Sequence, residues 1–156
     1  MKVLMICLGN ICRSPTAEVV LRVLAERESP GLFSLIDSAG TADYHLGEQP
    51  DARSVAAAAR RGYDLSALRA RQLVRDDFEN FDLILAMDRS NLAAMRALAP
   101  AAATDKLQLF LHYAPTAGLT EMPDPYYGQP SDFDRVIDLC ELAAQGLIKR
   151  FSSQRR

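Results

Sequence analysis

Short apolar runs alternate along this chain with segments of helical character, and this alternation limits the possible folds more than any other sequence feature. The first run, residues 3–6, is uninterrupted, as expected for a strand covered on both faces. Strands separated by helices favour a parallel sheet. We therefore predict an α/β fold, a single-domain three-layer sandwich with a four-stranded parallel sheet flanked by helices on both faces. The predicted strands are residues 3–6, 33–38, 82–87 and 106–111, and the predicted helices are 15–27 (with Ser14 as N-cap), 51–61, 90–98 and 132–150.

The length and the charge of the chain exclude several classes of protein. Its 156 residues fit one domain, which we assign to residues 1–156 with a frayed tail over 150–156. The formal net charge is −2, whereas non-specific nucleic-acid binders are usually basic, so we expect no nucleic-acid partner. No apolar run approaches the roughly 20 residues of a membrane span, and the N-terminal run is too short for a signal peptide. We expect a cytoplasmic monomer, and the excess of arginine over lysine, 15 to 3, suggests a bacterial source.

Three cysteines and two histidines are the other residues with chemical potential. An odd number of cysteines without a secretion signal predicts free thiols in a reducing compartment. Cys140 lies on the apolar face of the last predicted helix, which indicates a core residue. Cys12 is either a packing residue or a partner that traps an oxidised Cys7 as a disulfide. His45 and His112 are isolated, and the carboxylates lack ligand spacing, so we expect no metal and no other cofactor.

The segment between the first strand and the first helix is the most informative part of the chain. Residues 7–14 are Cys-Leu-Gly-Asn-Ile-Cys-Arg-Ser, at the carboxyl end of a strand, where parallel sheets bind their ligands. Backbone N–H groups in such a turn can converge on an anion, and a helix N-terminus adds positive potential. Gly9 permits a positive φ, Asn10 tolerates the left-handed region, and Arg13 has a planar fork that matches phosphate oxygens. The segment therefore predicts an anion site.

Cys7 is expected at the mouth of that anion site. The electric field that holds a phosphate also stabilises a thiolate, so a cysteine placed there can act as a nucleophile near neutral pH. Ser14 could donate a hydrogen bond to the sulfur and hold it as an anion. The loop thus combines a binding site for an oxyanion with a group that can attack it.

The pattern C-x5-R-S followed by Pro15 resembles the phosphate-binding loop of the low-molecular-weight protein tyrosine phosphatases. Further segments resemble that family in the family's order, so the similarity covers about residues 2–150. The C-x5-R pattern alone is a moderate signal, and Asp-Pro-Tyr-Tyr more than a hundred residues downstream makes it strong. The further segments are Asp37–Thr41, Arg69–Leu73, Leu85–Asp88 and Met122–Gly128.

This resemblance implies a protein tyrosine phosphatase that hydrolyses phosphotyrosine, and small aryl phosphates, through a phosphocysteine intermediate. Cys7 would be the nucleophile, Arg13 would bind the phosphoryl oxygens, and Asp124 would be the general acid and then the general base. Ser38 would support the loop, the partner would be a phosphotyrosine-containing protein, and no cofactor would be needed. The implied substrate-binding residues are Leu8, Gly9, Asn10, Ile11, Cys12, Ser14, Tyr44, Tyr126 and Tyr127.

Several other functions are compatible with parts of the pattern. Arsenate reductases of this fold pass oxidation to further cysteines, and the chain has none between Cys12 and Cys140. Related protein-arginine phosphatases tend to carry threonine where this loop has Ile11. A silent phosphopeptide-binding module would require a broken catalytic set, but Cys7, Arg13 and Asp124 are all present. A Walker-type nucleotide-binding loop would require Gly-Lys-Ser/Thr after the turn, and the sequence lacks it. One position departs from the family: Leu68 replaces a histidine that supports the loop, so we expect its hydrogen bonds to be rearranged or replaced by packing.

Overall fold

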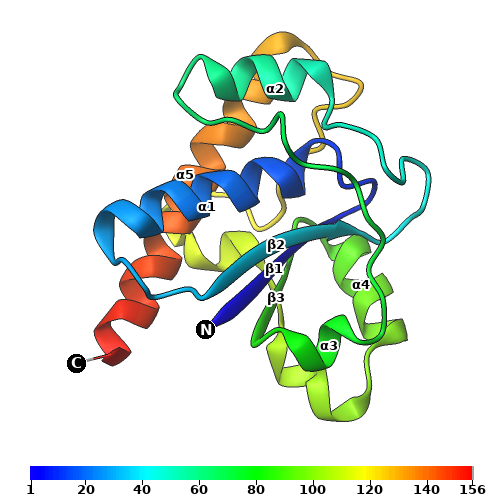
Figure 1. Cartoon of the computed structure of the whole chain (residues 1–156), viewed down its shortest axis with the longest axis vertical. Coiled ribbons are helices and arrows are strands. Elements are labelled where there is room, and N and C mark those ends of the chain that lie inside the picture. The colour runs from blue at the N-terminus through cyan, green and yellow to red at the C-terminus, as the bar shows by residue number, and fades with distance from the viewer. Residues whose placement is uncertain (156) are drawn as a thin grey trace.

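The computed structural model describes residues 1–155, and its centre is a four-stranded sheet in which all neighbouring strands are parallel (Figure 1). The strand order is β2-β1-β3-β4. The predicted α/β class and the four-stranded parallel sheet are thus confirmed. The second strand, predicted over 33–38, lies two residues later, and its pairing with β1 runs from Leu35 to Gly40. The strands are β1 (Lys2–Cys7), β2 (Leu35–Gly40), β3 (Leu83–Ala86) and β4 (Leu107–Leu109).

Helices cover both faces of the sheet, as Figure 1 shows. One face lies under α1 (Arg13–Glu28) and α5 (Pro130–Ser152), and α2 (Ala52–Ala59) packs against α5. The other face carries α3 (Asp77–Asn80) and α4 (Arg89–Leu98). The sequence pattern did not reveal α3, which is a single turn. The part of the chain that the structure describes also has four short 3-10 helices, at Ala101–Lys106, Phe110–Tyr113, Pro115–Ala117 and Ser153–Arg155.

The central strand β1 sends alternate side chains into two separate cores. Val3, Met5 and Cys7 join the larger core under α1 and α5, while Leu4 and Ile6 join the core under α3 and α4. All five are buried, which explains why this strand is apolar at successive positions and not at alternate ones. The alternation also sets the orientation of Cys7, which faces the side of the sheet on which α1 begins.

The start of α1 differs from our expectation. We predicted Ser14 as the N-cap, but the N-cap is Cys12 and Ser14 lies within the first turn. The Ser14 hydroxyl is engaged elsewhere: it accepts a hydrogen bond from the Asn10 side chain (2.8 Å) and lies 3.0 Å from the sulfur of Cys7. Pro15 is tolerated because the first turn of a helix needs no N–H from it. The predicted cap residue therefore serves the loop instead of the helix.

The C-terminal helix is longer than predicted at both ends. It begins at Pro130 and continues to Ser152, so the expected frayed tail is helical at its start. A 3-10 turn over Ser153–Arg155 follows, and Nη1 of Arg155 donates to Oγ of Ser29 (3.2 Å). Residue 156 lies outside the described residues. Within residues 1–155, every helix is either too short or too polar to cross a membrane.

The carboxyl ends of the strands bring together segments that are far apart in the sequence. Cys7 is paired with Gly40, and the amide of Met122 donates to the carbonyl of Met87 just after β3 (2.7 Å). Gly40, the last residue of β2, forms an isolated parallel bridge with Gln72 on the outer side of that strand, so the chain around residue 72 extends the sheet edge. Gly40 is needed here because a Cβ would lie 2.7 Å from the carbonyl oxygen of Leu8. This edge carries the predicted anion loop.

Candidate active site

The loop after β1 turns back through one residue in the left-handed region. That residue is Asn10, with φ of 57°, as its tolerance of this region led us to expect. The glycine beside it does not have a positive φ; a Cβ at Gly9 would lie 2.9 Å from Cδ2 of the His45 side chain, which would have to shift. Within the described residues, the amides of residues 9, 11, 12 and 13 donate to no protein group, as in an anion-binding helix N-terminus.

Cys7 lies at the floor of a cleft of about 200 Å³, and its side chain is only 3% exposed. Its sulfur lies 3.0 Å from the hydroxyl of Ser14 and accepts a hydrogen bond from the backbone amide of Asn10 (3.3 Å). Hydrogen bonds donated to a sulfur stabilise its negatively charged form. The sulfur thus has polar partners and lines the cleft, although the residue also contacts the larger core.

Arg13 is held beside that sulfur as a permanent cation. Its Nη1 donates to Oδ2 of Asp88 (2.7 Å) and to the carbonyl of Met122 (3.1 Å), and its Nη2 lies 3.5 Å from Oδ2 of Asp124. Burial alone would lower the pKa of Arg13, but the nearby charge of Cys7 and the hydrogen bond to Asp88 raise it above its ordinary value. The guanidinium is therefore charged and oriented, which suits a group that binds phosphoryl oxygens.

Asp88 connects this cation to the framework of the fold. Its Oδ2 accepts from Arg13, and its Oδ1 accepts from the backbone amide of Asn91 (2.8 Å), which caps α4. Asp88 thus both caps α4 and pairs with an arginine. The sequence could not indicate which arginine, because the two residues are 75 positions apart.

Asp124 lies on the long loop between β4 and α5 and overlooks the cleft. Its side chain is 46% exposed, and its Oδ1 accepts from the backbone amide of Tyr126 (3.1 Å). This turn and the contact between Met122 and β3 place the carboxylate opposite Arg13. The cleft is lined by Cys7, Leu8, Gly9, Ile11, Cys12, Arg13, Tyr44, His45, Asp124, Tyr126 and Tyr127.

Aromatic side chains form the upper walls of the cleft. Tyr44 and Tyr127 are highly exposed, at 72% and 96%, whereas Tyr126 is half-buried and meets Tyr127 edge to face, 4.9 Å between ring centroids. The guanidinium of Arg53 lies 5.5 Å from the centroid of the Tyr126 ring, a cation–π contact that supports it from behind. His45 also lines this wall, which the isolated position of that residue in the sequence had not indicated.

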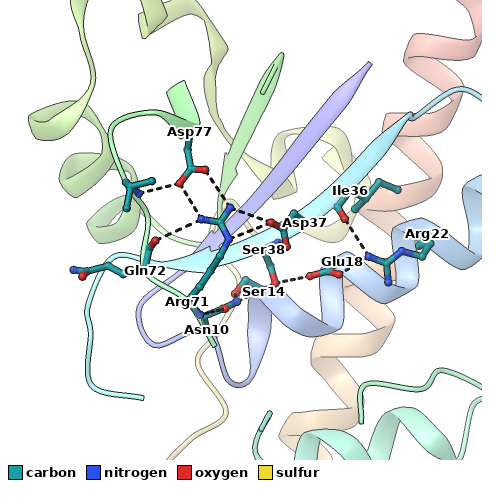
Figure 2. Close-up of polar contacts among 11 residues, drawn as sticks. Asn10, Ser14, Glu18, Arg22, Ile36, Asp37, Ser38, Arg71, Gln72 and Asp77 are labelled. Carbon is teal, nitrogen blue, oxygen red and sulfur yellow. Dashed lines mark hydrogen bonds and ion pairs between the residues drawn. The ribbon is translucent and has the colours of Figure 1, made fainter. Parts of the chain in front are cut away.

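Three of the predicted site residues lie behind the cleft and not on its surface. Nδ2 of Asn10 donates to Oγ of Ser14 (2.8 Å) and to Oγ of Ser38 (3.0 Å), and Oδ1 of Asn10 accepts from the backbone amide of Arg71 (3.0 Å). Figure 2 shows this cluster beside the start of α1. The same view shows the side chain of Arg71 between Asp37 and Asp77, to which it donates at 3.1 Å. These contacts attach the loop to β2 and to the segment before α3.

Leu68, the departure from the family pattern, is half-buried and packs against the larger core. At this position the chain therefore contributes packing, and the loop's hydrogen bond comes from the backbone of Arg71 nearby.

The remaining cysteines differ from Cys7 in their surroundings. Burial raises the pKa of Cys12 to about 12, and burial raises the pKa of Cys140 as well. All three cysteines are free thiols. Within residues 1–155, no three side chains of His, Cys, Asp or Glu lie close enough together to hold a metal ion.

Comparison with known proteins agrees with this geometry. Residues 2–156 match the family described as low molecular weight phosphotyrosine protein phosphatase. The chain belongs to this phosphatase family. It is 43% identical over 152 residues to a low molecular weight phosphotyrosine protein phosphatase of Schizosaccharomyces pombe, covering 95% of each chain. It is 39% identical over 156 residues to the low molecular weight protein-tyrosine-phosphatase of Streptomyces coelicolor, covering 98% of this chain and 94% of that one.

The chain also has the same fold as solved structures of protein tyrosine phosphatases. The crystal structure of a protein tyrosine phosphatase from Entamoeba histolytica, with Hepes in the active site, superposes with a TM-score of 0.94 at 39% identity. That alignment covers 100% of this chain and 99% of the other. Protein tyrosine phosphatases are phosphoric monoester hydrolases, so this low molecular weight phosphatase is an enzyme of that class with phosphoproteins as substrates.

Proposed function

We propose that this phosphatase hydrolyses phosphotyrosine, and small aryl phosphates, in two displacements through a phosphocysteine on Cys7. The proposal depends on one observation above all. The Cys7 sulfur lies beneath two hydrogen-bonding groups and beside the anchored cation of Arg13, at the floor of a cleft with aromatic walls. A nucleophile and a site for the oxyanion that it attacks are thereby in one place.

In the first displacement, the thiolate of Cys7 attacks phosphorus and an S–P bond forms as the P–O bond to the phenol breaks. Charge in the transition state is spread over three equatorial oxygens. In this proposal, those oxygens bind to the loop amides that lack a protein acceptor and to the part of the Arg13 fork that is not bound to Asp88. Asp124, in its protonated form, gives its proton to the departing phenolate oxygen.

In the second displacement, a water molecule attacks the phosphocysteine. Asp124, now a carboxylate, accepts a proton from that water, and the S–P bond breaks to release inorganic phosphate and restore the thiolate. The hydroxyl of Ser14, 3.0 Å from the sulfur, supports the thiolate as a leaving group. Each group therefore acts twice, and neither displacement calls on a residue outside the cleft and its supporting cluster.

The shape of the cleft favours aryl phosphates. The sulfur lies at the floor, and Tyr44, Tyr126 and Tyr127 form the walls above it. A phosphoserine side chain is too short to bring its phosphorus to that floor, whereas a phenyl ring can pack between the aromatic walls. Ile11 adds an apolar surface, which suits a phenyl ring better than a charged phosphoguanidine. These features support phosphotyrosine over phosphoserine and phosphoarginine.

The proposal is tested with two variants and a matched control. Cys7→Ser should abolish turnover of p-nitrophenyl phosphate while the folded protein still binds vanadate. Asp124→Ala should lower kcat on phosphotyrosine peptides about 10²–10⁴-fold, the usual contribution of a general acid, and should leave Cys7 reactive toward iodoacetate. Asp105→Ala removes an exposed carboxylate outside the cleft and should leave turnover unchanged.

Two outcomes would contradict the proposal. Turnover by Cys7→Ser near the parent rate would remove the nucleophile assignment. Equal kcat/KM on matched phosphotyrosine, phosphoserine and phosphoarginine peptides would remove the argument from the aromatic walls.

A further inference from the structure

The loop that carries Asp124 is attached to the body of the molecule by few polar contacts. At its start, Met122 is tied to β3 through its amide and to Arg13 through its carbonyl. Beyond Met122, within residues 1–155, every hydrogen bond of positions 123–129 is made inside the loop or to the start of α5. The ion pair between Asp124 and Arg13, at 3.5 Å, is the remaining polar contact of this stretch.

That ion pair is lost in the form of the enzyme that donates the proton. A general acid must be protonated, and a neutral Asp124 no longer attracts Arg13 as an ion. Packing then contributes more to the position of the loop. Pro125 is buried and Tyr126 is half-buried, whereas the other residues between positions 123 and 129 are exposed. The contacts of Tyr126 therefore affect where the proton is delivered.

Arg53 packs against Tyr126 and is itself held by two further groups. Its guanidinium carbon lies 5.5 Å from the centroid of the Tyr126 ring and 4.7 Å from that of Phe133, a buried residue of α5. The same guanidinium donates to both carboxylate oxygens of Asp51, from Nε (3.0 Å) and from Nη2 (2.9 Å). A two-point bond of this kind fixes the plane of the guanidinium as well as its position.

Asp51 connects this arrangement to the loop after β1. Its backbone amide donates to the carbonyl of Ile11 (2.8 Å), and its side chain caps α2 by accepting from the amide of Arg53 (2.8 Å). The helix α2 in turn packs against α5 (Figure 1). A continuous path of contacts thus joins the loop that contains Cys7 to the loop that contains Asp124.

From these contacts we infer that Arg53 is a positioning residue for the phosphatase reaction, because it holds the Tyr126 ring and, through it, the protonated Asp124 over the cleft. The link is short: the amide of Tyr126 donates to Oδ1 of Asp124 (3.1 Å), and a carboxylic acid still accepts at its carbonyl oxygen. Arg53 does not line the cleft, so it acts through its neighbours. The inference rests on the proposed role of Asp124 as the general acid.

The test uses leaving groups that differ in their need for a proton. Phenolate is about as basic as an ionised tyrosine side chain and must be protonated as it leaves, whereas 2,4-dinitrophenolate is a weak base that departs without a proton. Arg53→Met keeps an unbranched side chain but removes the cation and its fork. It should lower kcat/KM on phenyl phosphate about fivefold, the loss expected from two exposed cation–π contacts. On 2,4-dinitrophenyl phosphate, kcat/KM should stay within about twofold of the parent.

Two further variants separate positioning from a general loss of structure. Arg60→Met is the matched control, since it removes the arginine that follows α2 and its ion pair with Asp134 of α5 (3.5 Å). It should leave kcat/KM on both esters at the parent values. In Tyr126→Leu, which lacks the ring, the addition of Arg53→Met should cost less than about twofold on phenyl phosphate, because the path to Asp124 is already broken.

An equal fall on both esters in Arg53→Met would overturn the inference, because a general loss of site geometry does not depend on the leaving group. Parent values on both esters would overturn it as well, and so would a full fivefold loss in the Tyr126→Leu background.

Asp124→Ala, measured with the same two esters, distinguishes failure of this inference from failure of the proposed function. If Asp124→Ala loses far more activity on phenyl phosphate than on 2,4-dinitrophenyl phosphate and Arg53→Met does not, only the positioning role of Arg53 fails. If Asp124→Ala loses equally on both esters, the assignment of the general acid fails, and the positioning role fails with it.

Discussion

Asp88 lies between the guanidinium of Arg13 and the N-terminus of α4, and Asp88→Asn separates these two contacts. Asparagine is as good an N-cap as aspartate, so its oxygen can still accept from the amide of Asn91 and α4 keeps its cap. Its Nδ2, however, then faces Nη1 of Arg13, a donor against a donor. Both side chains of the original pair are largely buried, at 3% and 21% exposure, so solvent screens the loss little.

The size of the effect follows from those contacts. A hydrogen bond to a charged group contributes about 1.5–3 kcal/mol, and Arg13 keeps its bond to the Met122 carbonyl, so we take about 2 kcal/mol. If this loss falls on the transition state, kcat/KM for p-nitrophenyl phosphate falls roughly 30-fold. Urea unfolding should show a decrease in free energy of similar size. Asp88→Ala loses the cap as well and should unfold about 1 kcal/mol more easily than Asp88→Asn.

The assay is steady-state kinetics beside equilibrium unfolding of the same two variants. A kcat/KM of Asp88→Asn within twofold of the parent would refute the reasoning, because the orientation of Arg13 would then not depend on Asp88. Equal unfolding free energies for the two variants would refute the separation of cap from ion pair.

Three other predictions use different measurements. Burial raises the pKa of Glu18, so its contribution to stability is fully present at low pH and is lost as pH rises through that raised value; Glu18→Gln should be at least as stable as the parent at pH 7.5 and should flatten this part of a urea-measured pH profile. Because burial raises the pKa of Cys12 to about 12, iodoacetate at pH 8 should label Cys7 and leave Cys12 unlabelled in a peptide map, and labelling of both would contradict the burial argument. Gly40→Ala places a Cβ 2.7 Å from the Leu8 carbonyl oxygen, so unfolding should become easier by about 1–3 kcal/mol and kcat should fall at least tenfold; unchanged kinetics would mean that the loop can move aside at no cost.

The sequence predicted the sheet, and the position of the loop between β1 and α1, well because both depend on local pattern. The uninterrupted apolar run of β1 indicates a strand buried on both faces, and residues 7–14 contain their own turn, cation and thiol. The sequence predicted the start of α1 less well, because the Ser14 hydroxyl can either cap a helix or bind other side chains. Ser14 has the form of an N-cap, yet in the fold it is taken up by Asn10 and Cys7, which no local pattern reveals.

The supporting contacts could not be predicted because they join distant positions. The pairs Arg13–Asp88 and Asn10–Arg71 are 75 and 61 residues apart, and each depends on strand order. The contact between Asn10 and Arg71 also cannot be inferred from residue types, because position 71 contributes its backbone amide and not its side chain. His45 could not be placed at the site because an isolated histidine belongs to no spacing pattern, whereas in the fold it packs over Gly9 and lines the cleft.

The isolated bridge between Gly40 and Gln72 has a consequence for self-association. An outer strand of a sheet usually exposes unpaired N–H and C=O groups that can template pairing with another chain. Here Gly40 donates to the carbonyl of Arg71 (2.9 Å) and accepts from the amide of Leu73 (2.8 Å), so the carboxyl end of the outer strand is already occupied. The bridge between Gly40 and Gln72 therefore protects this end of the sheet edge against pairing with another chain.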